Sequence, residues 1–456
     1  MAIETTLWVS RHSLLHREVG ILGMTIAKFN RVFEDLTPRQ RKVLQEFLAG
    51  CTDEEIARSL YLEPSTVRRH LANICKRFNL SGLDQSRYSH RDELIDLFAQ
   101  FKPDMVSPTL IGKLGLSEPE FPGKPLPLNS LRYVQRPIEQ RCQREILKPG
   151  ALIRIRAPRR TGKTSLLNQL LGYARSASIR TIYLNLRQTE APFLASLDAL
   201  LRWLSTLMSQ QLGIPPRLDD YWDHENFGSI VSCTTYVQEH LLSQCPHELL
   251  LAIDEADWLF EVPKIAQGFF ALLRSWHEEA NNLPLWQHLR LVVVHSTDVY
   301  IPLNIHQSPF NVGLPVRLPN FSVEQVRLLA LRYDLNEATL AKIDALVTLT
   351  GGHPYLVQLA LYALWRQESE FDELLKMAST QSGIYSHDLR RCWQLLQNCP
   401  DLLSSLKAVI EASPEGAQLD PVCAYKLESM GLVRLQGNWV TLSCDLYRQY
   451  FSDRLL

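Results

Sequence analysis

A strand, a short loop and a helix are expected in succession at residues 151–167, and the loop carries the residue types that hold phosphate. A loop of this kind presents free backbone N–H groups at a helix N-terminus, where Lys163 supplies a cation for the β- and γ-phosphates and Thr164 a hydroxyl for Mg²⁺. The sequence therefore predicts a nucleotide site. Its expected members are Ala157, Pro158, Arg159, Arg160, Thr161, Gly162, Lys163, Thr164 and Ser165.

One position departs from the usual phosphate-loop pattern GxxxxGK[ST], because Ala157 stands where the first glycine belongs. Alanine can hold the entry turn only if its φ stays below zero, so the affinity or the loop geometry can differ from a standard site. The alternative is a surface loop that happens to contain Gly162, Lys163 and Thr164. The apolar run before the loop and the helical pattern after it favour the phosphate loop.

Magnesium and an attacking water need carboxylates on a second strand. Asp254 and Glu255 follow the apolar run 249–253. We expect Asp254 to hold Mg²⁺ together with Thr164, and Glu255 to polarise the water, with Glu255 and Lys163 as the catalytic pair. The alternative is a helix cap, since carboxylates favour helix N-termini. The phosphate loop about ninety residues earlier favours the catalytic interpretation.

A further apolar run, 291–294, ends in small hydroxyl residues. Ser296 and Thr297 are expected to face the γ-phosphate, and the alternative is a simple turn, which Ser and Thr often form. Asp298 occupies a position where an arginine would make the stronger phosphate sensor. Arg274, Arg290 and Arg317 are candidates for an arginine finger acting on a neighbouring subunit, and nothing in the sequence selects among them.

Composition limits the classes of protein that fit. The chain has 456 residues, 21% of them charged, with a net charge of −1, so a nucleic-acid footprint must be local. Nine scattered cysteines without a CxxC pair indicate reduced thiols and argue against a zinc site. The absence of a long apolar run and of a secretion signal argues against a membrane partner and predicts a cytoplasmic location.

The pattern of apolar residues predicts the fold class. Apolar runs at 151–155, 181–185, 249–253 and 291–294 alternate with amphipathic stretches, which indicates a parallel sheet with flanking helices, the α/β core of a P-loop NTPase. Residues 36–80 have a helical pattern with helix caps expected at Thr37, Thr52 and Ser65. Beyond Phe321 the pattern is helical until a short strand pair around Gly437.

The blocks 130–139 and 151–165, with Asp254, Glu255, 295–297, 311–315 and 351–354, resemble the AAA-like ATPase family of cyanobacterial and other bacterial proteins. That family is close to the STAND branch of AAA+ NTPases. The resemblance implies ATP or ADP with Mg²⁺ as cofactors. It places Tyr133, Val134 and Arg136 beside the adenine and ribose, and brings His353 and Pro354 of a helical lid to the nucleotide. From the residues alone, His353 can equally be a helix-capping or buried structural histidine. The C-terminal residues 425–441 resemble a winged helix.

Residues 36–78 resemble the helix-turn-helix of LuxR-type regulators. Ile56, Ala57, Leu60, Val67, Leu71 and Ile74 have the spacing of a buried face. A recognition helix in the major groove places Arg69, His70 or Asn73 near base edges, while Thr66, Arg68, Lys76 and Arg77 hold phosphates of double-stranded DNA. The alternative is a basic solvated face on a protein-interaction domain.

These inferences divide the chain into six parts and leave three hypotheses for function. The parts are an unassigned tail at 1–23, a helix-turn-helix domain at 24–101, a proline-rich linker at 102–127, the ATPase core at 128–320, a helical lid at 321–380 and a winged-helix domain at 381–456. Met24 is a more convincing start than Met1. The first hypothesis is a slowly hydrolysing, nucleotide-gated regulator of transcription or of defence against invading DNA. The second is a remodelling or transposition-type AAA+ assembly, and the third a non-catalytic scaffold. Protein partners or self-association are expected in each case.

Overall fold

The chain forms two compact units in a computed structural model that describes residues 26–78, 80, 90–102, 105–107, 110, 119–128, 130, 132–245, 247–296 and 309–456. One unit comprises the described residues of Met1–Glu120, Asn129–Val134 and Arg327–Leu340. The other comprises Phe121–Leu128, Gln135–Val326 and Ala341–Leu456. The expected tail at 1–23, and the question whether it is native, lie outside the described residues. The six-part division of the chain stays a prediction.

The first unit is helical, as expected. Its N-terminal helices are α2 (Ile26–Glu34), α3 (Pro38–Leu48), α4 (Asp53–Leu60), α5 (Pro64–Arg77) and α6 (His90–Phe101), and α15 (Glu337–Leu340) belongs to the same unit. Thr37 and Thr52 cap α3 and α4 through complete capping boxes with Gln40 and Glu55. The cap expected at Ser65 is wrong. α5 begins at Pro64 with Glu63 before it, because proline has no N–H to satisfy and its fixed φ suits the first helical position.

A continuous apolar core joins helices α2 to α6. Val67, Leu71 and Ile74 of α5 are fully buried in it together with Ile56 of α4, as the sequence pattern predicted. Phe29 lies at the other end of the core, with ring centroids 5.4 Å from Phe78 and 5.0 Å from Phe98. The burial of one face of α5 leaves its opposite face to solvent.

The second unit contains a five-stranded parallel sheet of order β2-β3-β4-β1-β5. The strands are β1 (Leu152–Arg156), β2 (Arg180–Asn185), β3 (Leu249–Asp254), β4 (Leu289–His295) and β5 (Leu314–Arg317). Four of them were predicted. β5 was not, since only four residues pair and two of them are exposed, which leaves no run of apolar residues to detect.

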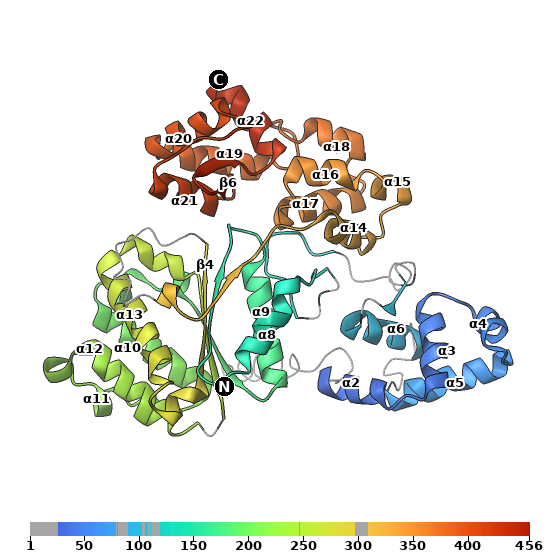
Figure 1. Cartoon of the computed structure of the whole chain (residues 1–456), viewed down its shortest axis with the longest axis horizontal. Coiled ribbons are helices and arrows are strands. Elements are labelled where there is room, and N and C mark those ends of the chain that lie inside the picture. Colours follow the sequence, from blue (N-terminus) through green and yellow to red (C-terminus); the bar gives the residue numbers. More distant parts are fainter. Residues whose placement is uncertain are drawn as a thin grey trace, which may run out of the picture. The chain divides into compact units, whose positions relative to one another are not determined.

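Helices cover both faces of the sheet (Figure 1). Leu291 and Val293 of β4 pack on one side with α10, α12 and α13, whereas Val292 and Val294 pack on the other side with α8 and α9. Successive side chains of a strand point to opposite faces, so a strand covered on both faces must be apolar throughout. This confirms the predicted α/β class.

The helices and short turns around the sheet are α8 (Pro137–Ile146), α9 (Lys163–Ser176), η2 (Leu186–Gln188), η3 (Ala191–Leu194), α10 (Leu197–Leu212), α11 (Leu218–Tyr221), α12 (His224–Thr235), η4 (Tyr236–Leu242), η5 (Ala256–Glu261), α13 (Pro263–Glu279), η6 (Pro284–His288) and η7 (Pro309–Asn311). After β5 the chain is helical again. It forms α14 (Val323–Leu331), α16 (Ile343–Thr350), α17 (Pro354–Trp365), α18 (Phe371–Met377), α19 (Ser386–Gln397), α20 (Pro400–Glu411), α21 (Pro421–Ser429) and α22 (Asp445–Leu455).

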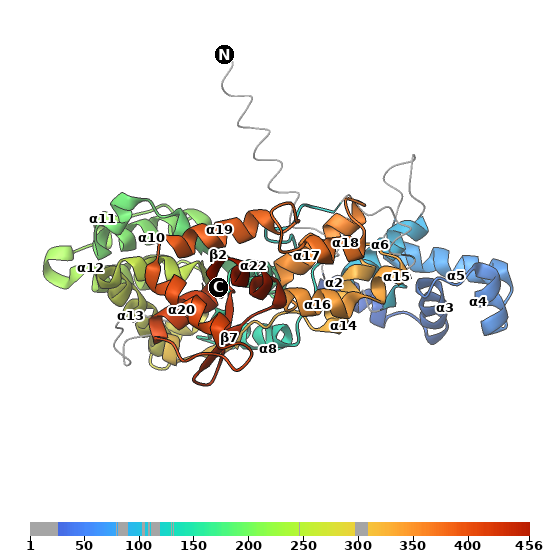
Figure 2. The same cartoon turned by 90° about the horizontal axis from the view of Figure 1, so that it is seen from above.

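The C-terminal helices carry the expected strand pair around Gly437. β6 (Val433–Gln436) and β7 (Trp439–Leu442) pair antiparallel, and Ala417 forms a further bridge to Val440. We refer to residues 386–455 as the C-terminal module. Viewed from above, its helices α19, α20 and α22 overlie the sheet (Figure 2). All nine cysteines are free thiols, and no described helix is long and apolar enough to cross a membrane.

Replacing the fully buried Leu71 by alanine should destabilise the first unit by about 2–5 kcal/mol, because it leaves a cavity in a closed core. Amide hydrogen exchange of α3–α5, measured by mass spectrometry on the whole chain, should accelerate accordingly. Exchange in β1–β5 should not change. The matched control is Leu328→Ala, a leucine of the same unit with an exposed side chain; equal acceleration in both variants would contradict the assigned core.

Candidate functional site

The loop between β1 and α9 has the conformation that a phosphate loop needs. Gly162 precedes α9 with φ +93°, a value that L side chains rarely adopt. Ala157 keeps φ below zero and is buried, so the missing first glycine leaves the entry turn intact. Arg160 in the middle of the loop has a φ of +60°, which is uncommon for a residue with a Cβ.

The Lys163 side chain is buried at the centre of the loop. Its ammonium donates hydrogen bonds to the carbonyl oxygens of Ala157, at 2.9 Å, and Pro158, at 3.0 Å. Burial lowers the pKa of Lys163, and the negative charges of Asp257, Glu255 and Asp254 oppose that shift. A cation held among carboxylates at a helix N-terminus is suited to anionic phosphate oxygens.

The two expected magnesium ligands meet at the carboxyl edge of the sheet. The Thr164 hydroxyl donates to Oδ2 of Asp254 at 2.8 Å, across ninety residues of sequence. Asp254 ends β3 and is 1% exposed. Hydroxyl and carboxylate oxygens are the donors that Mg²⁺ takes beside nucleotide phosphates, so this pair fits the ion.

Glu255 lies beside the same edge in a left-handed conformation, with φ +53°. Its backbone N–H donates to Oδ1 of Asp254 at 2.9 Å, which fixes the turn between the two acids. Nη1 of Arg187 lies 3.9 Å from its carboxylate. Burial, followed by the charge of Asp257, raises the pKa of Glu255. A carboxylate with a raised pKa is a better acceptor for a proton from water.

Two residues that contact this site were missed from the sequence. Asp257 accepts the backbone N–H of Ser296 at 2.8 Å and so ties the end of β4 to the turn η5. The Tyr183 hydroxyl donates to Asp254 at 3.2 Å, and burial raises the pKa of Tyr183 to about 12. A third acid two residues after Glu255 was a visible signal for Asp257. Nothing in the sequence signals Tyr183, because its contact depends on the pairing of β2 with β3.

Ser296 follows β4 and is 3% exposed. Its hydroxyl is buried and has no hydrogen-bond partner among the described residues. A buried hydroxyl without a partner costs free energy, and the predicted γ-phosphate contact would supply that partner. Thr297, the second residue of that prediction, lies outside the described residues.

The three residues expected at the adenine and ribose are divided between the units. Arg136 is 4% exposed, donates to the carbonyl of Thr161 at 2.7 Å and lies over the Phe321 ring at 4.8 Å, so it supports the phosphate loop directly. Tyr133 and Val134 belong to the first unit, where the Tyr133 carbonyl accepts from Arg332 at 2.7 Å. Their contact with a nucleotide stays a prediction.

His353 lies directly before α17, with Pro354 as the first residue of that helix. The His353 side chain does not cap the helix. Its Nε2 is 3.1 Å from the carbonyl oxygen of Arg159, so it donates in the neutral form and the ring packs on the phosphate loop. Burial lowers the pKa of His353 to about 4. The imidazole is thus a neutral, buried group that contacts the phosphate loop, and its contact with a nucleotide stays a prediction.

One arginine-finger candidate is wrong. Arg290 is 1% exposed, stands at the amino end of β4 and donates to the carbonyl of Ile146, while pairing with Glu248 at 2.7 Å. It is a structural residue at the edge opposite the phosphate loop. Arg274 pairs with Glu278 on its own helix, and Arg317 pairs with Glu428.

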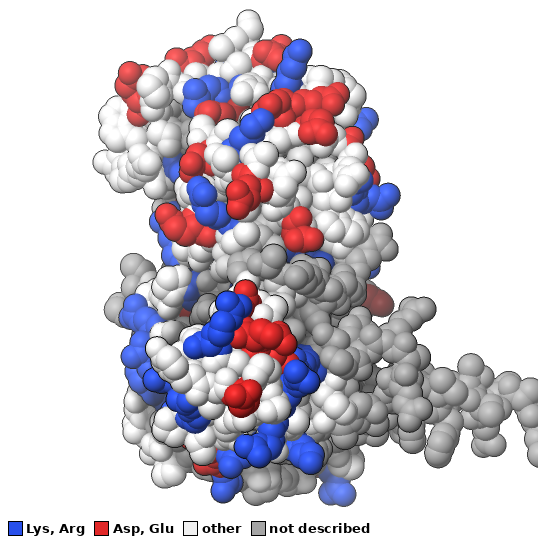
Figure 3. Space-filling view, turned by 90° about the vertical axis from the view of Figure 1, so that its right-hand side faces the viewer, with Lys and Arg blue, Asp and Glu red and all other residues white. Residues whose placement is uncertain are grey.

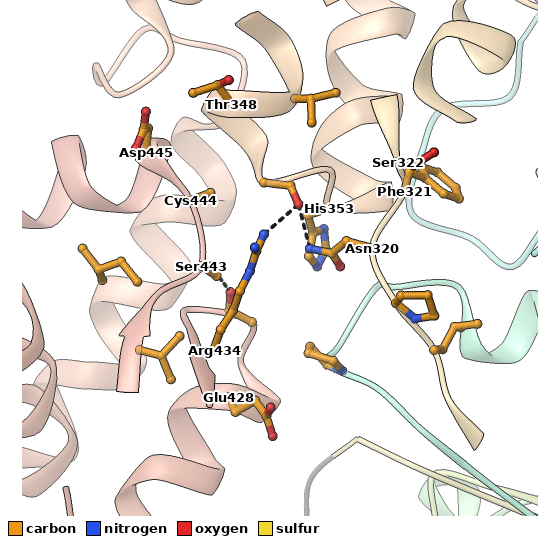
Figure 4. Close-up of a pocket in the computed structure, with 18 of the residues that line it drawn as sticks. Asn320, Phe321, Ser322, Thr348, His353, Glu428, Arg434, Ser443, Cys444 and Asp445 are labelled. Atoms are coloured by element: carbon orange, nitrogen blue, oxygen red, sulfur yellow. Dashed lines mark hydrogen bonds between the residues drawn. The ribbon is translucent and has the colours of Figure 1, made fainter. Parts of the chain in front are cut away.

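A cavity of about 1250 Å³ lies beside the loop, between the end of β5, the turn before α17 and the C-terminal module. Figure 4 shows the side chains of Asn320 and Arg434 converging on one backbone carbonyl, that of Gly351, at 3.0 and 2.9 Å. Pro158 and His353 also line it. The cavity therefore borders the phosphate loop on the side of the C-terminal module.

The outward face of α5 carries the residues predicted to contact DNA. Arg69, Asn73 and Lys76 are exposed, and Thr66 and His70 are partly exposed. Arg68 is exposed but lies 3.4 Å from Asp53, and Arg77 donates to the carbonyl of Asp35 at 2.6 Å. Figure 3 shows Lys and Arg side chains gathered around a smaller acidic group on the lower part of the view.

Comparison with known proteins decides the family. Residues 121–453 match the model of the AAA-like domain, which covers most of the chain. The chain belongs to the AAA-like domain family. Residues 34–87 match the LuxR family of bacterial regulatory proteins. This AAA-like protein thus has a LuxR-type helix-turn-helix before its AAA-like domain, as the two resemblances predicted. No curated protein matches the chain.

Several solved structures are similar to this AAA-like protein at low identity. A Walker-type ATPase of Pyrococcus abyssi has a TM-score of 0.48 at 15% identity and covers 70% of this chain and 96% of its own. The Aeropyrum pernix ORC2 protein, in ADPNP and ADP complexes, has a TM-score of 0.42 at 15% identity and covers 74% and 97%. At these scores the similarity says nothing about function.

The low pKa of His353 predicts how stability depends on pH. The folded value of about 4 lies below the ordinary 6.5, so the unfolded chain takes up the proton first as the pH falls. The contribution of neutral His353 to the free energy of unfolding is therefore complete above pH 6.5. It should decline towards pH 4, by at most about 3 kcal/mol. Thermal unfolding of His353→Gln should lack this part of the pH dependence. An exposed control, His387→Gln, should behave as the wild type; a wild-type slope in His353→Gln would contradict the prediction.

Proposed function

We propose that this protein is a nucleotide-gated regulator: it binds ATP or ADP with Mg²⁺, hydrolyses ATP slowly, and couples its nucleotide state to DNA binding by the helix-turn-helix. The contact between Thr164 and Asp254 carries the nucleotide part of the proposal. It brings a phosphate loop and a second-strand acid into contact where Mg²⁺ and the β- and γ-phosphates would lie.

Each residue of the site then has a role. Lys163 binds the β- and γ-phosphates, Thr164 and Asp254 hold Mg²⁺, and the loop from Ala157 to Ser165 supplies backbone N–H groups. When bound, Mg²⁺ neutralises charge that builds up on the phosphates. Glu255 orients the attacking water and accepts its proton. Ser296 senses the γ-phosphate with its unpartnered hydroxyl, and we extend that role to Thr297.

A switch needs two arrangements that bind the nucleotide differently. In this proposal His353 and the C-terminal module change position between the two arrangements. Both contact the phosphate loop directly, at Arg159. If a bound nucleotide changes the conformation of the loop, the packing of the lid (residues 321–380) and of the C-terminal module on the ATPase core would change with it. The proposed change would pass from there to the helix-turn-helix, through self-association or a partner protein.

Lys163→Ala should weaken nucleotide binding at least about tenfold, because the variant loses the only buried cation of the loop. Glu255→Gln should keep nucleotide binding but reduce turnover about 10²-fold or more, since its amide cannot accept the proton. Calorimetric titration with ADP and phosphate-release assays measure the two effects. Lys148→Ala, an exposed lysine paired with Glu145, is the control. Unchanged ADP binding in Lys163→Ala would favour a non-catalytic scaffold.

Duplex DNA binding should depend on the outward face of α5. Arg69→Ala should weaken binding about tenfold, and Lys76→Ala should reduce the slope of log K against log salt by about one. Lys42→Ala, an exposed lysine of α3, is the matched control. Fluorescence anisotropy should give different affinities with ADP and with a slowly hydrolysed ATP analogue. Identical affinities in both nucleotide states would contradict the switch.

The same samples separate the switch from a remodelling assembly. Size analysis of the wild type and Glu255→Gln with ATP, ADP and duplex DNA should show at most a small change of stoichiometry for a switch. ATP-dependent rings or filaments that persist in Glu255→Gln would instead favour the remodelling or transposition-type ATPase.

A further inference from the structure

The C-terminal module contacts the last residue of β1, Arg156, and the first half of the phosphate loop. Glu428 of α21 is buried and pairs with two arginines at once, Arg156 at 2.5 Å and Arg317 at 2.5 Å. These arginines end the neighbouring strands β1 and β5. One carboxylate of the module therefore binds the ends of both strands.

A second carboxylate binds the loop itself. Asp388 of α19 forms an ion pair with Arg160, and the Arg160 guanidinium lies over the Tyr355 ring at 4.3 Å. Arg160 adopts a left-handed φ of +60°, which costs free energy for any residue with a Cβ. Such a conformation persists only where its surroundings determine it, and Asp388 and Tyr355 are the groups that surround this side chain.

The module also uses the loop backbone. The N–H of Arg159 donates to the carbonyl of Ser429 at 2.9 Å, and the carbonyl of Arg159 accepts from His353. Gly431, with φ +81°, lies beside the loop, and a Cβ there would be in ordinary van der Waals contact with Pro158, at 3.7 Å. Both polar backbone groups of Arg159 are thus engaged by residues nearly two hundred positions or more away.

These contacts distinguish the two halves of the loop. Gly162, Lys163 and Thr164 are ordered by α9 and by the carboxylates of the core. Pro158, Arg159 and Arg160 contact the module, whereas Ala157 is held by the core, where its N–H donates to the carbonyl of His295. The carbonyls of Ala157 and Pro158 hold the Lys163 ammonium. A displacement of residues 156–160 would therefore alter the position of Lys163.

We propose that Asp388 and Glu428 are positioning residues of the nucleotide site, which hold residues 156–160 of the phosphate loop in the conformation that binds phosphate. The inference rests on the proposed nucleotide function, and it makes the C-terminal module part of the binding site. Release of the module then weakens nucleotide binding even though neither carboxylate touches the nucleotide. Pre-organised groups bind more tightly because ordering them costs nothing at the moment of binding.

The test uses Asp388→Asn and Glu428→Gln in the full chain, with Glu411→Gln as the control. Glu411 is an exposed acid of the same module, paired with Lys407 on its own helix. Trypsin cleavage after Arg159 and Arg160, followed by mass spectrometry, reports on the loop without any nucleotide. We expect cleavage at these two sites to accelerate at least about fivefold in both variants and to stay unchanged in Glu411→Gln.

Nucleotide affinity supplies the second readout. The Kd for ADP, and for a slowly hydrolysed ATP analogue with Mg²⁺, should rise about five- to tenfold in Asp388→Asn and in Glu428→Gln. Asp388→Glu keeps the charge and should restore at least half of the lost affinity, which a general loss of folding would not do. Circular dichroism of each variant should match the wild type.

The outcomes separate the inference from the function on which it rests. Wild-type cleavage rates and wild-type Kd values in both variants would overturn the inference and leave the proposed function standing. Tighter binding in either variant would also overturn it. If the wild-type chain binds neither nucleotide, the proposed function fails and the assignment of positioning residues for nucleotide fails with it. The cleavage rates would then still decide whether the two carboxylates hold the loop.

Discussion

A buried lysine surrounded by acids is the constraint on which the rest of the site depends. An ammonium removed from water is costly unless its hydrogen bonds and charge are matched. Lys163 meets that requirement with two loop carbonyls and three nearby carboxylates, Asp254, Glu255 and Asp257. Those acids end or follow β3, which is separated from β1 by β4, so they reach Lys163 only when β1, β4 and β3 are paired in parallel.

The parallel sheet solves this problem because all its strands end at one edge. The loop follows β1, the acids follow β3 and Ser296 follows β4, so residues from three distant segments converge without any long side chain. The apolar faces packed by α8–α9 and by α10–α13 fix the strands in register. Glu255, with its left-handed backbone, shows that the edge also tolerates local strain where a carboxylate must be aimed.

The C-terminal module adds a second layer over that edge. Its buried Glu428, together with Asp388, meets arginines of the loop and of the adjoining strands. Removing one partner of a buried ion pair is costly because it leaves the other charge uncompensated, and pairs that join separate segments are lost together when the segments part. In the proposed function, this arrangement would couple the geometry of the loop to the position of the module, as a nucleotide-dependent switch requires.

Much of the fold could be predicted from local sequence. Four of five strands, the caps at Thr37 and Thr52, the buried face of α5 and the strand pair around Gly437 all follow from short-range patterns of apolar residues and turn residues. β5, with four paired residues, is too short for such a pattern. The cap at Ser65 was misjudged because Pro64 itself can begin a helix. Arg290 was one of three candidates for an arginine finger, yet its position at the amino end of β4 buries it.

The sequence by itself determined which residues bear the chemistry: Gly162, Lys163 and Thr164 in one segment, Asp254 and Glu255 in another. Their types and their places after apolar runs predict phosphate and metal binding. Only the tertiary structure decided which other groups join them. Tyr183, Asp388 and Glu428 reach the site through strand pairing and through the packing of the module, and these long-range contacts leave no periodic trace along the chain.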